Sequence, residues 1–588
     1  MLDKKSFAVL NALRQTPGIS QRDIANASDL SLGTVNAAIK AVTEAGLVQN
    51  GKLTDAGLQA LAPHKVENAV IMAAGLSSRF APISYEKPKG LLKVRGEVLI
   101  ERQIEQLLEA GITDITVVVG YKKEYFFYLR QKYGVTIVNN DEYASRNNNG
   151  SLYRVREKLG NTYVCSSDDY FTENPFEPYV YKAYYSAQYA AGDTKEWCIT
   201  TGAQDRITKV VVGGSNSWYM LGHVYFDHAF SKRFVEILES EYNDPETVDK
   251  LWEDLYIDHI KELDMTMRPY PAGVINEFDS LDELRAFDPH FLENVDSEIF
   301  DNITEILGCT KAEIHDVYPL KQGLTNLSCH FATNDGEYVY RHPGVGTELL
   351  VNRRSEYTAL KKAKELGLDD TFIHEDPERG WKISKFVSNA KQPDPHNAIQ
   401  MAQMMKICRT LHESGAQVET EFDFYKEAKR YESLLLEKGP IDIPGYWEMA
   451  AEVDRLEEYV RADKAPKCLC HNDFFYLNFL IDEANKYYLI DWEYAGMSDY
   501  ANDFGTCCVC CELNANEIDA ALDAYFDRKA TPGERAHNYA HIALAGWCWY
   551  LWALLKEAEG DFVGEWLYIY YNYGREYLTK ALALYEEA

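Results

Sequence analysis

The hydrophobic positions follow helical spacing in the first part of the chain and a mixed spacing in the second. In residues 1 to 64, "SFAVLNALRQ" and "SLGTVNAAIKAVTEAG" repeat apolar residues every three to four positions, and an Asn-Gly pair typical of a hairpin turn follows. From residue 66 to 290, apolar runs such as "ENAVIMAAG" and "DITVVVGY" alternate with helical segments such as "VLIERQIEQLLEAGI". This alternation predicts a doubly wound α/β sheet.

The last part of the chain has a third pattern. A short α/β stretch, in which "YVYRHPG" is predicted to be a strand, precedes long helices rich in Tyr and Trp. The sequence therefore predicts a multidomain α/β protein with three domains, at 1–64, 66–290 and 295–588.

Charge and composition limit the kinds of partner that the chain can bind. The sequence holds 60 Lys and Arg against 92 Asp and Glu, a net charge of −32. This balance disfavours binding of nucleic acid or an anionic membrane by the whole chain, so a polyanionic nucleotide must meet local cations, backbone N–H groups or a metal ion. The N-terminus has no long apolar segment, no run of 18 uncharged apolar residues occurs, and the "CCVCC" cluster is expected to hold reduced, buried thiols. We therefore expect a cytoplasmic protein without a membrane segment.

The segment "ISQRDIANASDLSLGTVNAAIKAVTEAGLV" resembles the winged helix-turn-helix domains of bacterial regulators. In those domains the second helix of the pair enters the major groove of DNA. The corresponding helix here offers Ser31, Thr34, Asn36 and Lys40. Residues 1–64 hold nearly equal numbers of basic and acidic side chains, so both DNA binding and a docking or dimerisation role stay open.

The stretch "IMAAGLSSRF" predicts a strand, a loop of small residues and then a basic residue. Small residues let the backbone approach a phosphate or a base, although the loop alone is equally compatible with a plain tight turn. "EKPKGLLKV" then adds Lys87 and Lys89. The combination resembles the nucleotidyltransferases that make sugar-nucleotide and cytidine-diphosphate products, with their Rossmann-like fold, over residues 66–290.

This resemblance implies roles for five residues. It implies that Ala73, Ala74 and Gly75 contact the base and ribose of the nucleotide. It also implies that Arg79 and Lys89 hold the triphosphate and the attacking phosphate as catalytic residues.

Acidic residues follow two later strands of the same domain. In "YVCSSDDYF", Asp168, with Asp169 as the alternate, stands where the family keeps a metal-binding Asp. "INEFDSLDEL" matches the closing element of the family, in which Asp279 with Glu277 completes an Mg²⁺ site. The implied reaction is attack of a phosphomonoester oxygen on the α-phosphorus of CTP with release of pyrophosphate, which needs charge neutralisation and alignment more than a base.

The strings "NNNGSLYRVREKL" and "GGSNSWYMLGHVYF" resemble the bacterial CTP:phosphocholine cytidylyltransferases. A quaternary ammonium group is held best by aromatic faces. Trp197, Trp218 and Tyr219 are candidates for such a cage, and ordinary core or surface packing is the alternative for each of them.

The stretch "HNDFFYLN" carries a second kind of chemistry. Kinase-like phosphotransferases use an Asp that accepts the substrate hydroxyl proton, an Asn five residues later and a second Asp on a nearby strand. Here Asp473, Asn478 and Asp491 follow that order, and His471 would brace the loop. The pattern resembles the choline/ethanolamine kinase family, kin to the aminoglycoside phosphotransferases, over about 300–588; it implies a protein-kinase-like fold, Asp473 as the catalytic base, and Mg²⁺ on Asn478 and Asp491.

The same resemblance extends to the nucleotide side. "LKQGLTNLSCHF" matches the hairpin that covers the ATP phosphates, with Gly323, Thr325 and Asn326 near them. "YVYRHPG" places Arg341 where protein kinases carry a strand Lys, and "NRRSEYTAL" supplies Glu356 as its partner.

The substrate side is aromatic. "GWCWYLWALLK" places Trp549 and Trp552 on one helical face, and "YYNYGREYL" adds Tyr571. In choline kinases such residues form the wall for the trimethylammonium group, whereas core packing is the alternative. Glu493 and Glu512 are candidate acidic supports.

The two resemblances converge on one metabolite. They imply a bifunctional enzyme that phosphorylates choline with ATP and joins the phosphocholine to CMP from CTP, with Mg²⁺ as cofactor. Three alternatives remain: ethanolamine or another amino alcohol as substrate, an antibiotic phosphotransferase fused to a sugar nucleotidyltransferase, and a ligand-sensing transcriptional regulator with degenerate enzyme domains.

Overall fold

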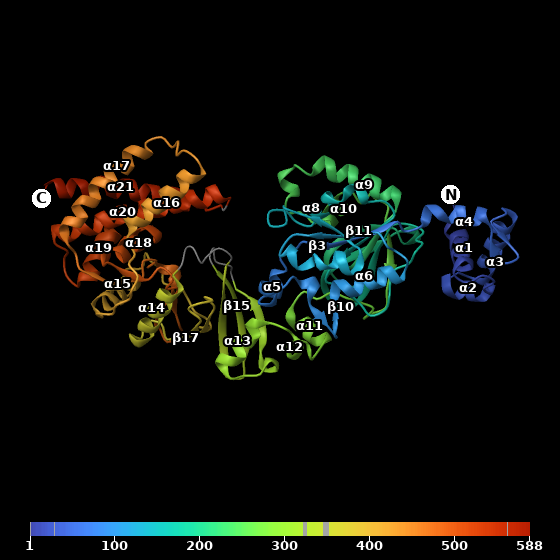
Figure 1. The fold of residues 1–588 in the computed structure, drawn as a ribbon, viewed down its shortest axis with the longest axis horizontal. Helices are drawn as coiled ribbons and strands as arrows, with labels where there is room; N and C mark the ends of the chain where they lie inside the picture. Colours follow the sequence, from blue (N-terminus) through green and yellow to red (C-terminus); the bar gives the residue numbers. More distant parts are fainter. Residues whose placement is uncertain (1, 29, 321–325, 345–351, 561, 588) are drawn as a thin grey trace. The chain divides into compact units, whose positions relative to one another are not determined.

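The computed structural model describes residues 2–28, 30–320, 326–344, 352–560 and 562–587. The chain divides into two compact units, whose main parts are residues 1–302 and 320–588. We describe each unit separately (Figure 1).

The N-terminal part of the first unit is a helix-turn-helix module with a small hairpin. Its elements are α1 (Lys4–Gln15), α2 (Gln21–Ser28), α3 (Leu32–Glu44), β1 (Val48–Gln49), β2 (Lys52–Leu53) and α4 (Asp55–Leu61). The side chains of Asp3 and Ser31 cap α1 and α3 by accepting hydrogen bonds from backbone N–H groups of the first turn. Val9, Ile24 and Val35 are fully buried between the helices. The predicted winged helix-turn-helix fold is confirmed.

A seven-stranded sheet forms the centre of the first unit, in the order β12-β10-β11-β8-β3-β6-β7. Its strands are β3 (Asn68–Ala73), β6 (Ile115–Val119), β7 (Thr136–Asn139), β8 (Thr162–Ser166), β10 (Tyr184–Thr201), β11 (Ile207–Phe226) and β12 (Thr266–Pro269). Strand β3 runs parallel to β6 and β8, whereas β10 and β11 form a long antiparallel pair.

Helices and short strands surround this sheet. The helices are α5 (Ile83–Glu86), α6 (Leu99–Glu109), α7 (Tyr128–Tyr133), α8 (Asn149–Arg154), α9 (His228–Glu241), α10 (Trp252–Asp258), α11 (Leu281–Phe287) and α12 (Phe291–Asn294). The short strands are β4 (Lys93–Val94), β5 (Glu97–Val98), β9 (Tyr170–Phe171) and β13 (Ile275–Asn276). The chain then forms α13 (Glu298–Leu307) and β14 (His315–Pro319).

The two faces of the sheet are both covered, which explains the unbroken apolar run in β3. Ala69 and Ile71 pack in one cluster with Ile104 of α6. Val70 packs in another cluster with Phe234 of α9. Because neighbouring residues of a strand point to opposite faces, this alternation is that of a doubly wound sheet, as the sequence predicts.

The second unit begins with an antiparallel sheet and one helix. The sheet has five strands in the order β14-β15-β16-β18-β17. After β14 its strands are β15 (Asn326–Thr333), β16 (Gly336–Pro343), β17 (Phe372–Glu375) and β18 (Lys382–Lys385), and the helix is α14 (Arg353–Glu365). Strand β16 lies between β15 and β18, and its Arg341 pairs in register with Lys382. This pairing places two cations side by side above α14.

The rest of the second unit is mainly helical. Its helices are α15 (Ala398–Glu413), α16 (Phe424–Lys438), α17 (Tyr446–Asp463), α18 (Ala501–Cys510), α19 (Ala515–Phe526), α20 (Pro532–Glu559) and α21 (Trp566–Glu587). Its strands are β19 (Lys467–Cys470), β20 (Phe479–Ile481), β21 (Tyr487–Leu489) and β22 (Gly496–Asp499). Helices α20 and α21 approach closely at Gly546, where a Cβ atom would lie 2.5 Å from the backbone N of Gly574. The predicted protein-kinase-like architecture, a small sheet followed by a helical part, is confirmed.

Within the described part of the chain, no helix has both the length and the apolar character needed to cross a membrane. The cysteines of the "CCVCC" cluster are free and buried.

Candidate active sites

The loop after β3 borders a cavity of about 500 Å³ in the first unit. Ala73 ends β3 as a buried residue, Ala74 is buried as well, and Gly75 is exposed. A Cβ atom at Gly75 would meet no other atom within 4 Å, so its backbone faces open space. Such a backbone is accessible to a base or a phosphate.

A buried ion pair lies in the wall of this cavity. Lys89 is 7% exposed, and its Nζ lies 2.5 Å from Asp168 Oδ2. The Ser166 hydroxyl donates to the other oxygen of Asp168 at 2.6 Å. Burial alone would lower the pKa of Lys89 and raise that of Asp168, but the opposite charge of each partner overrides burial, so the pKa of Lys89 is raised and that of Asp168 is lowered. Both side chains are therefore charged at neutral pH.

The structure separates the two adjacent acids that the sequence left as alternates. Asp168 lines the cavity. Asp169 is fully buried, and neither of its carboxylate oxygens has a hydrogen-bond partner among the described residues. Burial first, and then the charges of Glu277 and Asp168, raise the pKa of Asp169 well above its usual range.

Asp279 and Glu277 approach the same ion pair from the loop before α11. Asp279 lines the cavity, and its Oδ1 lies 2.8 Å from Arg79 Nη1. Burial first, and then the charge of Asp168, raise the pKa of Glu277 to about 8. Carboxylates crowded together in this way fit a divalent cation, because a cation relieves their mutual repulsion and hard oxygen ligands suit Mg²⁺. Asp168 and Asp279, with Glu277 behind them, are the residues here that could hold it.

The aromatic residues expected around a quaternary ammonium lie on the long β10–β11 pair. Trp197 and Trp218 are half-buried against the core, and Trp218 meets the ring of Tyr189 edge-on at a centroid distance of 5.5 Å. Burial first, and then Glu196 and Glu277, raise the pKa of Tyr219. None of the three candidates is among the described residues that line the 500 Å³ cavity, so the aromatic cage stays a prediction.

Sequence reasoning missed the polar side of this cavity. Asn140 is buried, and its amide donates to the Ser151 hydroxyl at 3.2 Å. Both residues line the cavity together with Tyr143. Asn140 lines the cavity because it directly follows β7, and no local motif marks it. The run of asparagines at 147–149 is the nearest signal in the sequence.

In the second unit a network of backbone bonds holds the loop after β19. Asp503 of α18 accepts hydrogen bonds from the backbone N–H of His471 at 2.9 Å and of Asn472 at 2.6 Å. The His471 ring Nε2 donates to the Ile490 carbonyl at 2.9 Å. Asn472 has a positive φ of 64°, which the bonds to Asp503 compensate. The expected brace on this loop therefore includes Asp503 as well as His471.

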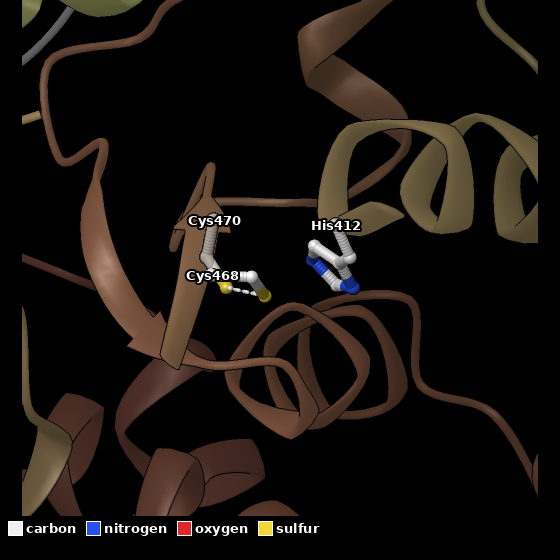
Figure 2. A group of neighbouring side chains, drawn as sticks. All are labelled: His412, Cys468 and Cys470. Carbon is white, nitrogen blue, oxygen red and sulfur yellow. Dashed lines mark hydrogen bonds between the residues drawn. The ribbon is translucent and has the colours of Figure 1, made fainter. Parts of the chain in front are cut away.

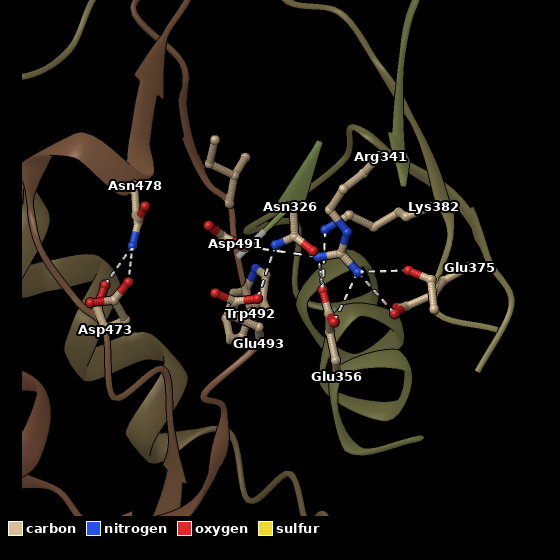
Figure 3. Close-up of polar contacts among 12 residues, drawn as sticks. Asn326, Arg341, Glu356, Glu375, Lys382, Asp473, Asn478, Asp491, Trp492 and Glu493 are labelled. Carbon is tan, nitrogen blue, oxygen red and sulfur yellow. Dashed lines mark hydrogen bonds and ion pairs between the residues drawn. The ribbon is translucent and has the colours of Figure 1, made fainter. Parts of the chain in front are cut away.

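The loop presents Asp473 to Asn478 and Asp491 (Figure 3). The Asn478 amide donates to Asp473 Oδ2 at 2.8 Å and to the Asp473 carbonyl at 2.8 Å. Burial first, and then the charge of Asp491, raise the pKa of Asp473 to about 8. A carboxylate of raised pKa can accept a hydroxyl proton, and the side-chain oxygens of Asn478 and Asp491 are hard ligands of the kind Mg²⁺ prefers.

Arg341 stands at the centre of a buried charge cluster on the other side of Asp491 (Figure 3). Its guanidinium makes two parallel hydrogen bonds with Glu356, of which Nη2–Oε2 is 2.9 Å, and lies 3.2 Å from Glu375. Lys382 Nζ lies 3.4 Å from Glu356 Oε1, and Arg341 Nη1 lies 3.9 Å from Asp491 Oδ1. The cluster therefore joins the strand cation, its helix partner and the candidate metal ligand.

Of the three residues expected in the phosphate-covering hairpin, Gly323 and Thr325 lie outside the described residues. Asn326 begins β15, accepts from Arg353 Nη2 at 3.1 Å and donates to Glu493 at 3.1 Å. Burial first, and then Asp491, raise the pKa of Glu493 to about 7. Glu493 thus contacts the nucleotide-side cluster, whereas the sequence placed it beside the substrate.

The residues expected in the substrate wall differ in how deeply they are buried. Trp549 is buried, and its ring meets that of Trp552 edge-on at 6.2 Å and that of Tyr494 at 5.8 Å. Tyr571 is 38% exposed, whereas Tyr570 is 8% exposed. Burial first, and then the charges of Cys510 and Asp473, raise the pKa of the Tyr570 hydroxyl. Burial first, and then neighbouring charges that include Asp473, also raise the pKa of Tyr494, and sequence reasoning named neither Tyr494 nor Tyr570.

Four further candidates are surface residues. Glu512 follows α18 as an exposed residue with a positive φ of 52°. In the N-terminal module, the Ser31 hydroxyl is used as the cap of α3, and Asn36 and Lys40 are exposed on that helix. Lys40 pairs with Glu44 at 3.7 Å.

Three family models match the chain. The phosphotransferase enzyme family matches residues 316–537, the MobA-like NTP transferase domain matches residues 69–189, and the winged helix-turn-helix DNA-binding model matches residues 2–49. Fold and sites thus define a transferase in which a nucleotidyltransferase domain precedes a kinase-like domain.

Individual relatives are more specific. The choline-phosphate cytidylyltransferase of Streptococcus pneumoniae is 38% identical over 217 residues, which are 37% of this chain and 95% of that protein. The 2-aminoethylphosphonate cytidylyltransferase of Lancefieldella rimae is 37% identical over 225 residues, 38% of this chain and 92% of that protein. The crystal structure of choline kinase LicA from Streptococcus pneumoniae is 26% identical, covers 49% of this chain and 98% of that chain, and gives a TM-score of 0.41. The chain belongs to the choline-phosphate cytidylyltransferase family through its central domain, to which an N-terminal winged helix-turn-helix and a C-terminal choline kinase-like domain are joined.

Proposed function

We propose that this protein makes CDP-choline in two steps, with the kinase-like domain forming phosphocholine and the central domain transferring a cytidylyl group to it. The observation that carries the proposal is the pairing of two complementary sites in one chain. The cavity with Lys89, Asp168 and Arg79 suits a nucleotide and a phosphomonoester, and the loop with Asp473 suits transfer of phosphate to a hydroxyl. One reaction would supply the nucleophile of the other.

In the first step Asp473 accepts the proton of the choline hydroxyl. The choline oxygen attacks the γ-phosphorus of ATP, and ADP leaves. Trp549, Tyr494 and Tyr570 would offer aromatic faces to the substrate. Cation–π attraction of about 0.5–2 kcal/mol for each good contact would favour a quaternary ammonium there. Asn478 and Asp491 would hold Mg²⁺, which supplies charge neutralisation on the phosphates.

In the second step an oxygen of phosphocholine attacks the α-phosphorus of CTP and pyrophosphate leaves. Lys89 is held in place by Asp168 and presents a buried positive charge to the reacting phosphates. Arg79 is mostly exposed at the cavity mouth, where it can follow the triphosphate. Asp168 and Asp279 would hold Mg²⁺, whose charge offsets that of the leaving pyrophosphate.

The proposal assigns the second step to residues 66–290 and the first to residues 295–588, in a cytoplasmic protein with access to ATP and CTP. A second candidate is cytidylyl transfer to 2-aminoethylphosphonate, which is favoured by the 37% identity with the enzyme of that name. A phosphonate carries its own phosphorus–carbon bond and needs no kinase to supply its nucleophile. The kinase-like domain in the same chain therefore favours a phosphomonoester substrate over a phosphonate.

The test is a product assay on the full chain with ATP, CTP and Mg²⁺. Choline, ethanolamine and 2-aminoethylphosphonate are supplied in separate reactions, and phosphorylated and cytidylylated products are followed by mass spectrometry. The proposal expects CDP-choline only when both nucleotides are present. It also expects the Asp473→Ala variant to make CDP-choline from added phosphocholine but not from choline. Cytidylylation of 2-aminoethylphosphonate without turnover of choline would replace the proposal by the second candidate.

A further inference from the structure

A cluster of two histidines and one carboxylate lies in the second unit, apart from the residues assigned to either reaction. His537 and His541 stand four residues apart on α20, so they share one helical face. Asp499 ends β22 and faces both rings. The candidate ligand atoms of the three residues all lie within 4.8 Å of one another.

Each imidazole is oriented by a partner behind it. His537 Nδ1 lies 2.8 Å from Asp463 Oδ2, and His541 Nδ1 lies 2.9 Å from the Asn502 amide oxygen. Both partners are acceptors, so each Nδ1 carries the proton and donates it. Both Nε2 atoms are thereby turned towards Asp499, at 3.0 Å from Oδ1 for His537 and at 3.6 Å from Oδ2 for His541. Metal-binding histidines have this arrangement, with the second ring nitrogen donating to a carboxylate or carbonyl.

His541 points to a missing positive charge between the three residues. The residue is 4% exposed, and its buried Nε2 has no hydrogen-bond partner among the described residues. A neutral imidazole would direct a lone pair at a carboxylate oxygen, which is also an acceptor. A cation bound by all three groups resolves this opposition.

We propose that Asp499, His537 and His541 form a binding site for a divalent transition-metal ion of the zinc class. Two imidazoles and one carboxylate suit Zn²⁺, with water in the fourth position, whereas Mg²⁺ prefers oxygen ligands alone. Bonds of about 2.0–2.1 Å in tetrahedral geometry separate ligand atoms by roughly 3.3 Å, between the two distances observed. The partly exposed side of Asp499 gives an ion access from solvent.

A second cluster nearby has softer ligands but no available imidazole (Figure 2). Cys468 and Cys470 project from β19 with their sulfurs 3.7 Å apart, near His412. Both ring nitrogens of His412 are already used, Nε2 with Asp503 at 2.9 Å and Nδ1 with the Tyr525 hydroxyl at 2.9 Å. Metal binding by this ring would break the bond to Asp503 or the bond to Tyr525. We therefore assign the ion to the first cluster and use the thiols as its control.

The site connects α20 with the catalytic loop through one side chain. Asn502 accepts from His541, and its amide nitrogen donates to the Asn472 side chain at 3.2 Å. Asn472 directly precedes Asp473. A bound ion would therefore fix the helix that carries Trp549 relative to the loop that carries the base, and the proposal does not depend on which alcohol is phosphorylated.

The test is a Zn²⁺ competition titration of the full, untagged chain against a chromophoric chelator. Mg²⁺ is kept in large excess so that it occupies the oxygen-ligand sites of both active sites. We expect one Zn²⁺ bound per wild-type chain, no such binding in His541→Gln, and unchanged binding in the double variant Cys468→Ser, Cys470→Ser. Asp463→Ala, which removes the supporting acceptor of His537, should weaken affinity by about 10–100-fold.

Cobalt substitution of the wild-type chain gives a readout that needs no variant. Co²⁺ bound by nitrogen and oxygen ligands shows visible d–d bands without the near-ultraviolet charge-transfer band of a thiolate ligand. The proposal is overturned if that thiolate band appears, if wild type takes up no Zn²⁺, or if folded His541→Gln binds Zn²⁺ as tightly as wild type. In the last case the cluster is held together by a protonated His537 that pairs with Asp463 and Asp499, and not by a metal ion.

Discussion

Replacing Asp473 with asparagine is expected to stabilise the second unit while it abolishes phosphoryl transfer. Burial and the charge of Asp491 raise the pKa of Asp473 to about 8, against about 3.9 for an unperturbed Asp. Below about pH 4 the carboxyl is neutral in the folded and in the unfolded chain. Between about pH 4 and about pH 8 only the unfolded chain ionises it, so its contribution to the free energy of unfolding falls as pH rises and is lost above about pH 8.

The size of this effect follows from the difference between the two pKa values. A difference of about 4 units at about 1.4 kcal/mol each gives about 6 kcal/mol as an upper limit. Asp473 is partly open to solvent, and water screens part of the charge, so we expect about 2–3 kcal/mol. The Asn478 amide, which donates to Asp473 Oδ2 at 2.8 Å, keeps an acceptor when asparagine replaces the acid.

The assay is thermal unfolding in Mg²⁺-free buffer with a chelator, at several pH values from about 5 to about 8.5. The Asp473→Asn variant should unfold roughly 4–12 °C higher than wild type at the upper end of this range, with a smaller gain at the lower end. The exposed Asp442 of the same unit supplies the control variant Asp442→Asn, which should leave the midpoint unchanged. Equal or lower stability of Asp473→Asn, or a gain that does not change with pH, would refute the reasoning.

Three further predictions concern the other sites. Lys89→Ala should abolish cytidylyl transfer to phosphocholine and leave phosphorylation of choline intact, as product analysis would show; loss of both activities in folded protein would contradict separate sites. Tyr570→Ala should raise KM for choline by about tenfold with KM for ATP unchanged, because a cation–π contact is worth about 0.5–2 kcal/mol, whereas Tyr571→Ala at the exposed position should change KM little; the reverse order would favour Tyr571, the residue that the sequence indicates. If α3 binds DNA, Lys40→Glu should weaken the shift of a DNA fragment in a gel and make its loss with salt less steep, because fewer counterions are released; absence of any shift with wild type would favour the docking role.

The fold was predictable because each part has its own local signal. The apolar run of β3 indicates a strand that is buried on both faces. The glycine that follows the run indicates an exposed turn after the strand. Asp473, Asn478 and Asp491, which are close along the chain, also lie close together in the structure (Figure 3). Local sequence patterns suffice where the functional residues are close along the chain.

The residues that were missed come from tertiary contacts. Lys382 approaches Glu356 only because β18 pairs in register with β16, and nothing in its own segment marks it. Tyr570 and Tyr571 occupy neighbouring positions in an aromatic run, so the buried face of α21 could not be chosen until its packing against α20 was known. Burial likewise distinguishes Asp169 from its neighbour, and adjacent acids look alike in sequence.

The arrangement of charge explains how so acidic a chain can bind polyanionic nucleotides. In the central domain Lys89 holds Asp168 ionised while burial raises the pKa of Glu277 to about 8. In the kinase-like domain Arg341 holds Glu356 ionised, while burial first, and then the charge of Glu356, raise the pKa of Glu375 to about 8. Each site therefore combines one fixed ion pair with further carboxyls that ionise fully only when positive charge arrives. A divalent cation brought with the nucleotide would supply that charge, so acidic residues favour the nucleotide–metal complex over the bare nucleotide.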